Sequence, residues 1–413
     1  MINWWNLSIL GIANALNRSV SPMVTFVGGL VGIKLASNPI WATVAPAILV
    51  IGMGLSAYPV ASLMGRIGRR NGFLLLSLIG AVASSVAALA IMAESYVVFC
   101  AAMLGIGANI ACVQQYRFAA AENIAKERAS TAISLVLFTG VAAAFIGPEV
   151  GVQAKEWIEN APFAGSFLVL AALGILTTIV LAFYQDDASD GDADVRDHEH
   201  ARPLRDIAGQ TSYRIATLCG MVAYGVMSLI MTATPISMHL GHGFSLRESG
   251  IVMQSHVAAM YLPSLITGKL ISSWGLGPVM LAGLVLMAAC LLINLAHEGF
   301  GHFWVALVCL GIGWNFLFVA GTSLLNKSYR RSERFKAEGL NDGFVFTTMA
   351  VVALGAGVLV ELVGWRWTNI AMIPILAGTG FMLILGWRHL DSASHPTMAT
   401  SPSKYKSAVI RQS

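Results

Sequence analysis

Charged residues are scarce in this chain. Asp, Glu, Lys and Arg together make up only 11% of its 413 residues, whereas a soluble domain carries about 25%. Hydrophobic residues make up 56%, and the mean hydropathy is +0.72. This composition excludes an ordinary soluble globular protein. The net charge of only +4 also gives no reason to expect a nucleic-acid partner.

Several other signals are missing. The five cysteines all fall within apolar segments and form no CxxC pair, so neither a disulfide framework nor a zinc site is expected. The amino-terminal apolar run lacks a preceding basic segment and a cleavage site, so it predicts a membrane span rather than a signal peptide. The chain contains no nucleophile–base pair, phosphate loop or cofactor fingerprint. We therefore expect a protein that is not an enzyme and has no cofactor.

Long apolar runs dominate what is present. Each is long enough to cross a hydrocarbon core of about 30 Å, and they are too continuously apolar for barrel strands. They predict an all-α integral membrane protein with twelve transmembrane helices. The predicted spans are residues 6–33, 39–63, 72–93, 96–116, 131–153, 162–184, 213–237, 248–272, 277–297, 302–325, 339–363 and 366–388.

The basic residues fix the predicted orientation in the lipid bilayer. With both termini inside, 20 of the 25 Lys and Arg face the cytoplasm, and Arg18 lies within the first span. The opposite orientation would violate the positive-inside rule. We therefore expect a multi-pass protein of a bacterial cytoplasmic (inner) membrane. The four basic residues that face outward are Lys34, Lys155, Arg247 and Arg366.

The chain divides into two similar halves. The segment GIGANIACV at 105–113 resembles GIGWNFLFV at 311–319, and ASLMGRIG at 61–68 resembles GKLISSWG at 268–275. These repeats have nearly equal offsets, so they predict two pseudo-symmetric six-helix bundles with a substrate site between them. The predicted divisions are an amino-terminal bundle (1–185), an acidic central loop on the cytoplasmic side (186–212), a carboxyl-terminal bundle (213–390) and a cytoplasmic tail (391–413).

The segment MGRIGRRNG (64–72) resembles the cytoplasmic signature of the major facilitator superfamily, Gly-xxx-Asp-Arg-x-Gly-Arg-Arg. Arg66, Gly68, Arg69 and Arg70 match it, and the resemblance implies that they belong to the conformational machinery. Gly65 stands where the superfamily has an aspartate, so the carboxylate thought to latch the two halves is missing. The resemblance implies the major facilitator fold and transport by alternating access.

Ionisable side chains at membrane depth are candidates for function. They are Arg18, Arg117, Glu149, His256 and Asp342. Arg117 and Asp342 lie near the predicted cytoplasmic ends, where pairing between helices is the simple interpretation. Arg18 lies halfway along the first span and needs either a partner or a water-accessible cavity. The sequence leaves those two roles open.

Methionine and histidine form a pattern on two consecutive spans. Met227 and Met231 share one face of the seventh span, and His256 and Met260 share one face of the eighth. The two antiparallel helices place these pairs at about the same depth. Thioether and imidazole groups together suit Cu(I). The alternative is an ordinary core histidine among methionines that fill space.

MxxxM followed by HxxxM resembles the CcoA-like copper importers within the superfamily. That resemblance implies that Met227, Met231, His256 and Met260 bind copper. It also implies that the transported copper supplies assembly of a C-type haem–copper cytochrome oxidase. Relatives in the same group that lack these pairs are thought to import riboflavin. The principal hypothesis is therefore a secondary transporter that imports Cu(I).

Further residues could assist copper transfer. Cys219 could act as a relay, while Met238, His239 and His242 lie in the outer loop and could collect the ion at the entrance. A cytoplasmic copper acceptor could receive it. Each of these residues also has an ordinary structural interpretation.

Two alternatives remain. The first is an importer of riboflavin or another small organic solute, for which Tyr224, Tyr261, Trp314 and Asn315 are candidate contacts. The second is a membrane sensor or assembly partner that transports nothing.

Overall fold

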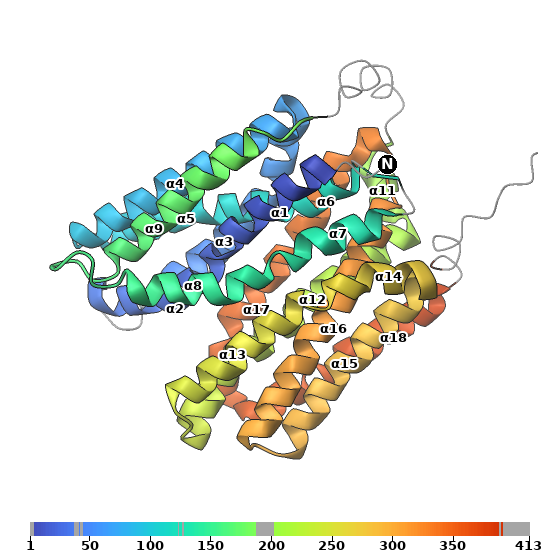
Figure 1. Ribbon diagram of the computed structural model, residues 1–413. Coiled ribbons are helices and arrows are strands. Elements are labelled where there is room, and N and C mark those ends of the chain that lie inside the picture. The colour runs from blue at the N-terminus through green and yellow to red at the C-terminus, as the bar shows by residue number, and fades with distance from the viewer. Residues whose placement is uncertain are drawn as a thin grey trace, which may run out of the picture.

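The computed structural model is all-helical (Figure 1). It describes residues 4–36, 41, 44–122, 124–125, 128–186, 202–387 and 390. Most of the predicted central loop and the whole predicted tail at 391–413 lie outside these residues. In Figure 1 the amino-terminal helices, blue to green, lie mainly on one side, and the carboxyl-terminal helices, yellow to red, lie mainly on the other.

The described residues of the amino-terminal half form nine α-helices. They are α1 (Trp4–Arg18), α2 (Val20–Leu35), α3 (Val44–Ile67), α4 (Arg69–Met92), α5 (Tyr96–Gln114), α6 (Tyr116–Glu122), α7 (Ala129–Phe138), α8 (Val141–Gln153) and α9 (Ala164–Leu181).

The carboxyl-terminal half begins with a short helix and continues with longer helices, with two short irregular helices between them. These are α11 (Leu204–Gly209), α12 (Thr211–Ile236), the π-helix η5 (Ser237–Gly241), α13 (Leu246–Tyr261), α14 (Ser264–Trp274), α15 (Leu276–Ala296), α16 (Phe300–Asn326), the 3-10 helix η6 (Arg331–Glu333), α17 (Arg334–Ile370) and α18 (Ile373–Leu385). Gly364, with φ at 81°, interrupts α17 and separates the eleventh span from the twelfth.

Within the described residues, nine helical stretches are long and apolar enough to cross a membrane. The other three predicted spans are present, but each consists of two shorter helices. The first span is α1 and α2, the fifth is α7 and α8, and the eighth is α13 and α14. The all-helical architecture predicted from the sequence is confirmed.

Proline accounts for two of these breaks. Pro22 lacks the N–H that would bond to the carbonyl of Arg18, and the break between α1 and α2 falls at Ser19. Pro263 likewise ends α13. Asn315 stabilises this second break, because its Nδ2 donates to the Met260 carbonyl at 2.7 Å and to Ser264 Oγ at 2.6 Å.

The repeat appears in the backbone as well as in the sequence. Gly68 has φ at 84° and Gly275 has φ at 88°, and each lies between two consecutive spans of its half. A residue with a Cβ rarely adopts this conformation. Both glycines therefore let the chain turn tightly between helices at equivalent places.

Candidate functional site

The methionine and histidine pairs lie on α12 and α13. Met227, His256 and Met260 are buried, and Met231 is partly buried. Both helices pack along α16. His256 and Met260 make their polar contacts with α16, through the His256 ring and the Met260 carbonyl. Within the described residues, no group of three or more His, Cys, Asp or Glu side chains could hold a metal ion.

The imidazole of His256 is completely buried, and one of its nitrogens is occupied. Its Nδ1 lies 2.8 Å from the Leu307 carbonyl oxygen, which can only accept, so Nδ1 carries the proton. Among the described residues, Nε2 has no hydrogen-bond partner. A histidine that ligates a metal commonly donates its other N–H to a carbonyl in this way. The geometry therefore leaves one lone pair of the ring available.

The secondary copper candidates have structural contacts. Cys219 is buried beside Gly321, and Met238 is buried. His239 Nδ1 lies 2.8 Å from the Phe244 carbonyl oxygen. Both nitrogens of His242 are used, at 2.9 Å from the Ser237 carbonyl and 2.7 Å from Glu298 Oε2. A copper ion at His242 would have to displace one of these partners.

The contact between His242 and Glu298 should make the outer loops sensitive to pH. Partial burial lowers the pKa of His242, but the hydrogen bonds to Glu298 and Ser237 outweigh it and raise the pKa above its ordinary value. Both partners are acceptors, so they favour the imidazolium. The contact is therefore complete below about pH 6.5 and is lost as the pH rises through the higher pKa of the folded protein. Amide exchange in residues 237–245 should increase over that range relative to intrinsic exchange. Glu298→Gln should remove most of the effect.

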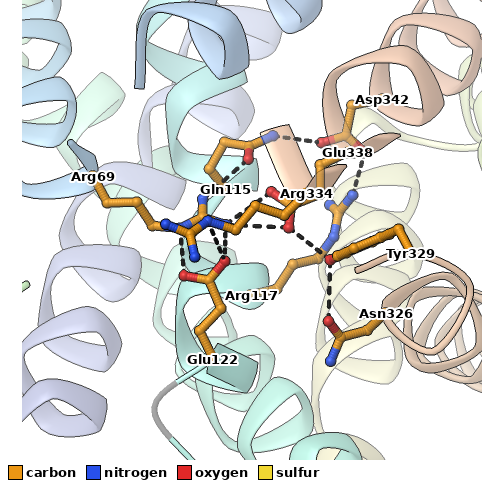
Figure 2. A network of polar contacts seen from close by, with 9 residues as sticks. All are labelled: Arg69, Gln115, Arg117, Glu122, Asn326, Tyr329, Arg334, Glu338 and Asp342. Carbon is orange, nitrogen blue, oxygen red and sulfur yellow. Dashed lines mark hydrogen bonds and ion pairs between the residues drawn. The ribbon is translucent and has the colours of Figure 1, made fainter. Parts of the chain in front are cut away.

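The three arginines of the 64–72 motif have different contacts. In the part of the chain that the structure describes, Arg69 alone among them bonds to the other half, as Figure 2 shows for its contact with Glu338. Its Nε and Nη2 bond Glu122 at 2.8 and 2.6 Å, and Nη2 also bonds Glu338 at 2.9 Å. Arg70 donates to the Ala182 carbonyl within its own half, and Arg66 is exposed. We call Arg69, Glu122 and Glu338 the latch.

The latch explains why the motif can lack its aspartate. A Cβ at Gly65 would lie 3.1 Å from the ring of Phe335, which comes from the other half. The same ring lies 4.9 Å from the guanidinium carbon of Arg69. An aromatic ring therefore occupies the place next to position 65, and Glu338 supplies a carboxylate from the carboxyl-terminal half.

A second buried ion pair joins the halves next to the latch. Arg117 Nη2 donates to Asp342 Oδ1, and both side chains are 1% exposed. Gln115 connects this pair to the latch, since its Nε2 donates to Asp342 at 3.2 Å and its Oε1 accepts from Arg69 at 3.3 Å (Figure 2). The simple interpretation of Arg117 and Asp342, pairing between helices, is confirmed.

Arg18 lies at the other end of a series of polar contacts that runs from the latch through Gln115, Asp342, Arg117 and Gln114. We call this series the polar chain. The Nε of Arg18 donates to Asn14 Oδ1 at 3.0 Å, Nη1 to the Tyr261 hydroxyl at 3.3 Å, and Nη2 to Gln114 Oε1 at 3.0 Å. Gln114 Oε1 also accepts from Arg117 at 3.0 Å. We call Arg18, Asn14, Gln114 and Tyr261 the Arg18 cluster.

Aromatic rings lie beside the Arg18 cluster. The ring of Tyr261 lies edge-on to Trp314 at 5.8 Å, and Trp314 lies edge-on to Tyr224 at 5.3 Å. Among the described residues, the buried Nε1 of Trp314 has no hydrogen-bond partner. The side chain of Asn315, in contrast, already has partners. Its Nδ2 donates at the Pro263 break, and its Oδ1 accepts a hydrogen bond from the Thr267 hydroxyl.

The sequence did not predict a role for Glu122, Glu338 or the two glutamines Gln114 and Gln115. Both carboxylates fall outside the predicted spans, where a charged side chain is ordinarily solvated. Both glutamates lie, like the 64–72 motif, in predicted cytoplasmic connections between spans, and this shared side of the membrane was a usable signal. Glu149, a candidate at membrane depth, is exposed and accepts a hydrogen bond from Gln153.

Comparisons with known proteins agree with this architecture. A family model described as Major Facilitator Superfamily matches residues 216–411. The riboflavin transporter RfnT of Brucella anthropi is 39% identical over 380 residues, which cover 92% of this chain and 95% of that protein.

Solved structures match over nearly the whole chain. The human organic anion transporter MFSD10 superposes with a TM-score of 0.76, covering 92% of this chain and 99% of that one at 13% identity. The proton:xylose symporter XylE superposes with a TM-score of 0.73, covering 94% of this chain and 97% of that one at 12% identity. At these identities, the structures show the fold alone.

Proposed function

Because this chain belongs to the major facilitator superfamily and is a multi-pass membrane transporter rather than an enzyme, we propose that it imports riboflavin or a closely related planar solute. The observation that carries this proposal is the 39% identity to a riboflavin transporter over nearly the full length of both chains. Similarity of this extent makes a similar substrate the best-supported choice, ahead of copper.

The site residues are compatible with such a solute. Tyr261, Trp314 and Tyr224 provide aromatic surface, and Arg18 and Gln114 provide polar groups beside it. Binding sites for small molecules combine apolar walls with a few polar groups that fix orientation. We propose that the solute binds here and that the latch opens and closes below it.

Copper import is the second candidate, and His256 is the observation that favours it. The proton of the ring is fixed on Nδ1, and Nε2 has no hydrogen-bond partner within the described ranges. Buried methionines are present on α12 and α13. On this hypothesis Met227, Met231, His256 and Met260 hold Cu(I) during transport. The supply of a cytochrome oxidase and a cytoplasmic acceptor are further parts of the same hypothesis.

Uptake measurements decide between the two substrates. We expect cells that make the protein to accumulate labelled riboflavin faster than cells without it, and copper at the same rate. His256→Ala and Met231→Ala should leave riboflavin uptake, measured per amount of protein in the membrane, close to that of the parent, because neither side chain belongs to the proposed flavin site. Uptake is normalised in this way because His256 is buried and its loss can lower the amount of folded protein. Copper uptake that depends on the protein and is abolished by both variants would reverse the assignment. Proteoliposomes containing the purified protein test whether it transports any solute by itself.

A further inference from the structure

Arg18 is a cation whose charge is not balanced by an ion pair. Its three hydrogen bonds all go to neutral oxygens, and among the described residues no carboxylate forms an ion pair with it. The polar chain from Arg18 to the latch contains four cations and three carboxylates. Glu122 pairs with Arg69 and Arg334, Glu338 pairs with Arg69, and Asp342 pairs with Arg117. Arg18 is the fourth cation. An unpaired cation at membrane depth costs free energy unless an acceptor can reach it.

The breaks in three spans meet around this cation. Arg18 is the last residue of α1, and Asn14 Nδ2 reaches the end of α7 through Thr139 Oγ1 at 3.0 Å and the Val136 carbonyl at 2.9 Å. A Cβ at Gly140, in the break after α7, would lie 3.1 Å from the ring of Tyr261. Tyr261 is itself the last residue of α13. Transporters commonly form their substrate sites from such discontinuous helices.

Arg18 also links the two halves. Its longest hydrogen bond, 3.3 Å, crosses from α1 to Tyr261 of the carboxyl-terminal half, while those to Asn14 and Gln114 stay within its own half. The side chain is only half-buried, so part of it remains accessible. A solute that offers acceptors could replace Tyr261 at the guanidinium without breaking the other two bonds.

We propose that Arg18 binds the acceptor edge of the transported solute and determines specificity for it. This inference rests on the proposed riboflavin transport. In the isoalloxazine ring of a flavin, N1 and the neighbouring carbonyl oxygen O2 form a pair of adjacent acceptors without hydrogens. The planar guanidinium presents two parallel donors that match such a pair. Tyr261 and Trp314, which contact each other edge to face, then supply the aromatic surface on one side of the ring.

Lumiflavin and lumichrome distinguish this role from a merely structural one. Both have the tricyclic ring without the sugar chain, but lumichrome carries a hydrogen on N1 and so lacks the acceptor pair. Binding to the purified full-length chain is measured by flavin fluorescence, with each compound as competitor against riboflavin. We expect lumiflavin to compete at least tenfold better than lumichrome, because charge-assisted hydrogen bonds are the stronger class.

Two variants of Arg18 test the assignment. Arg18→Gln should bind riboflavin at least tenfold more weakly and should lose most of its preference for lumiflavin. Arg18→Lys keeps the charge but cannot form two parallel bonds, so it should retain part of the affinity and little of the preference. Lys269→Gln is the matched control, since it removes one exposed positive charge from α14 and should bind as the parent does.

The outcomes separate the inference from the proposed function. If the parent binds riboflavin and both Arg18 variants bind it equally well with the same preference for lumiflavin, the assignment of Arg18 is wrong and flavin transport stands. If the parent binds no riboflavin, the proposed function fails and the inference fails with it. If Arg18→Gln does not fold, as judged by size-exclusion chromatography, the lumiflavin preference of Arg18→Lys alone decides.

Discussion

Arg69→Gln should open the predicted cytoplasmic end of the protein. Arg69 is 3% exposed and is the cation that Glu122 and Glu338 share across the two halves. Among the described residues, Glu122 then keeps only Arg334, at 3.4 Å, and the buried carboxylate of Glu338 loses its cation. Removing one partner of a buried ion pair costs about 3–5 kcal/mol, and protonation of one carboxylate recovers part of that cost. We expect the population of the latched state to fall by about tenfold to a hundredfold.

Spin labels on either side of the latch measure this change. Arg128→Cys at the start of α7 and Lys269→Cys on α14 are both exposed, and the two helices pack against each other where Thr131 meets Gly268. The distance between the spin labels at positions 128 and 269 should be short and narrowly distributed in the parent. It should be longer in the protein with Arg69→Gln. Four of the five native cysteines are buried and should label slowly.

Arg66→Gln is the control for the same motif. It makes the same change of charge three residues away, but Arg66 is exposed. Its distance distribution should match that of the parent. An unchanged distribution with Arg69→Gln would show that the latch does not hold the halves together.

Asp342→Asn should strongly destabilise the fold. The substitution leaves the guanidinium of Arg117 buried without its carboxylate, between the rings of Phe118 at 4.4 Å and Phe318 at 4.6 Å. The expected loss is about 3–5 kcal/mol, and the melting temperature of the purified protein should fall by roughly 5–15 °C. Glu156→Gln removes a carboxylate from the exposed pair with Lys155 and should change the melting temperature little.

A second substitution tests the physical cause of that loss. Adding Arg117→Met to Asp342→Asn removes the uncompensated cation and replaces it with a long apolar side chain. Because buried pairs can often be replaced by apolar groups at little cost, the double variant should be more stable than Asp342→Asn alone. If the double variant is instead less stable, the packing of the arginine side chain, and not its charge, supports this place in the fold.

Local patterns in the sequence predicted the spans well. Apolar runs of sufficient length predicted all twelve segments, because a helix is the simplest way to satisfy backbone hydrogen bonds in lipid. The breaks in three of them were not predicted, although Pro22 and Pro263 were visible. A proline inside a helix removes one backbone hydrogen bond, yet Pro59 and Pro235 lie inside continuous helices. Whether the helix is interrupted depends on partners such as Asn315, which bonds a carbonyl left free at the break.

The candidate site was predicted only in part. The signature at 64–72 directed attention to Arg69, but nothing in the motif distinguishes it from Arg66. His256 and the methionines were selected by spacing along their helices, yet the partner of the His256 ring is on α16, more than fifty residues away. Spacing within one helix gives the face of a side chain and not the helix that faces it.

The sequence by itself determined the membrane location, the two similar halves and the superfamily, because these depend on composition and on repeats along the chain. Only the tertiary structure decided which charges are balanced. Arg117 pairs with Asp342, and Arg69 pairs with Glu122 and Glu338. Arg18, among the residues that the structure describes, hydrogen-bonds to neutral oxygens. The physical reason is that an ion pair forms over a few ångströms between helices distant in sequence, so it depends on how the helices pack.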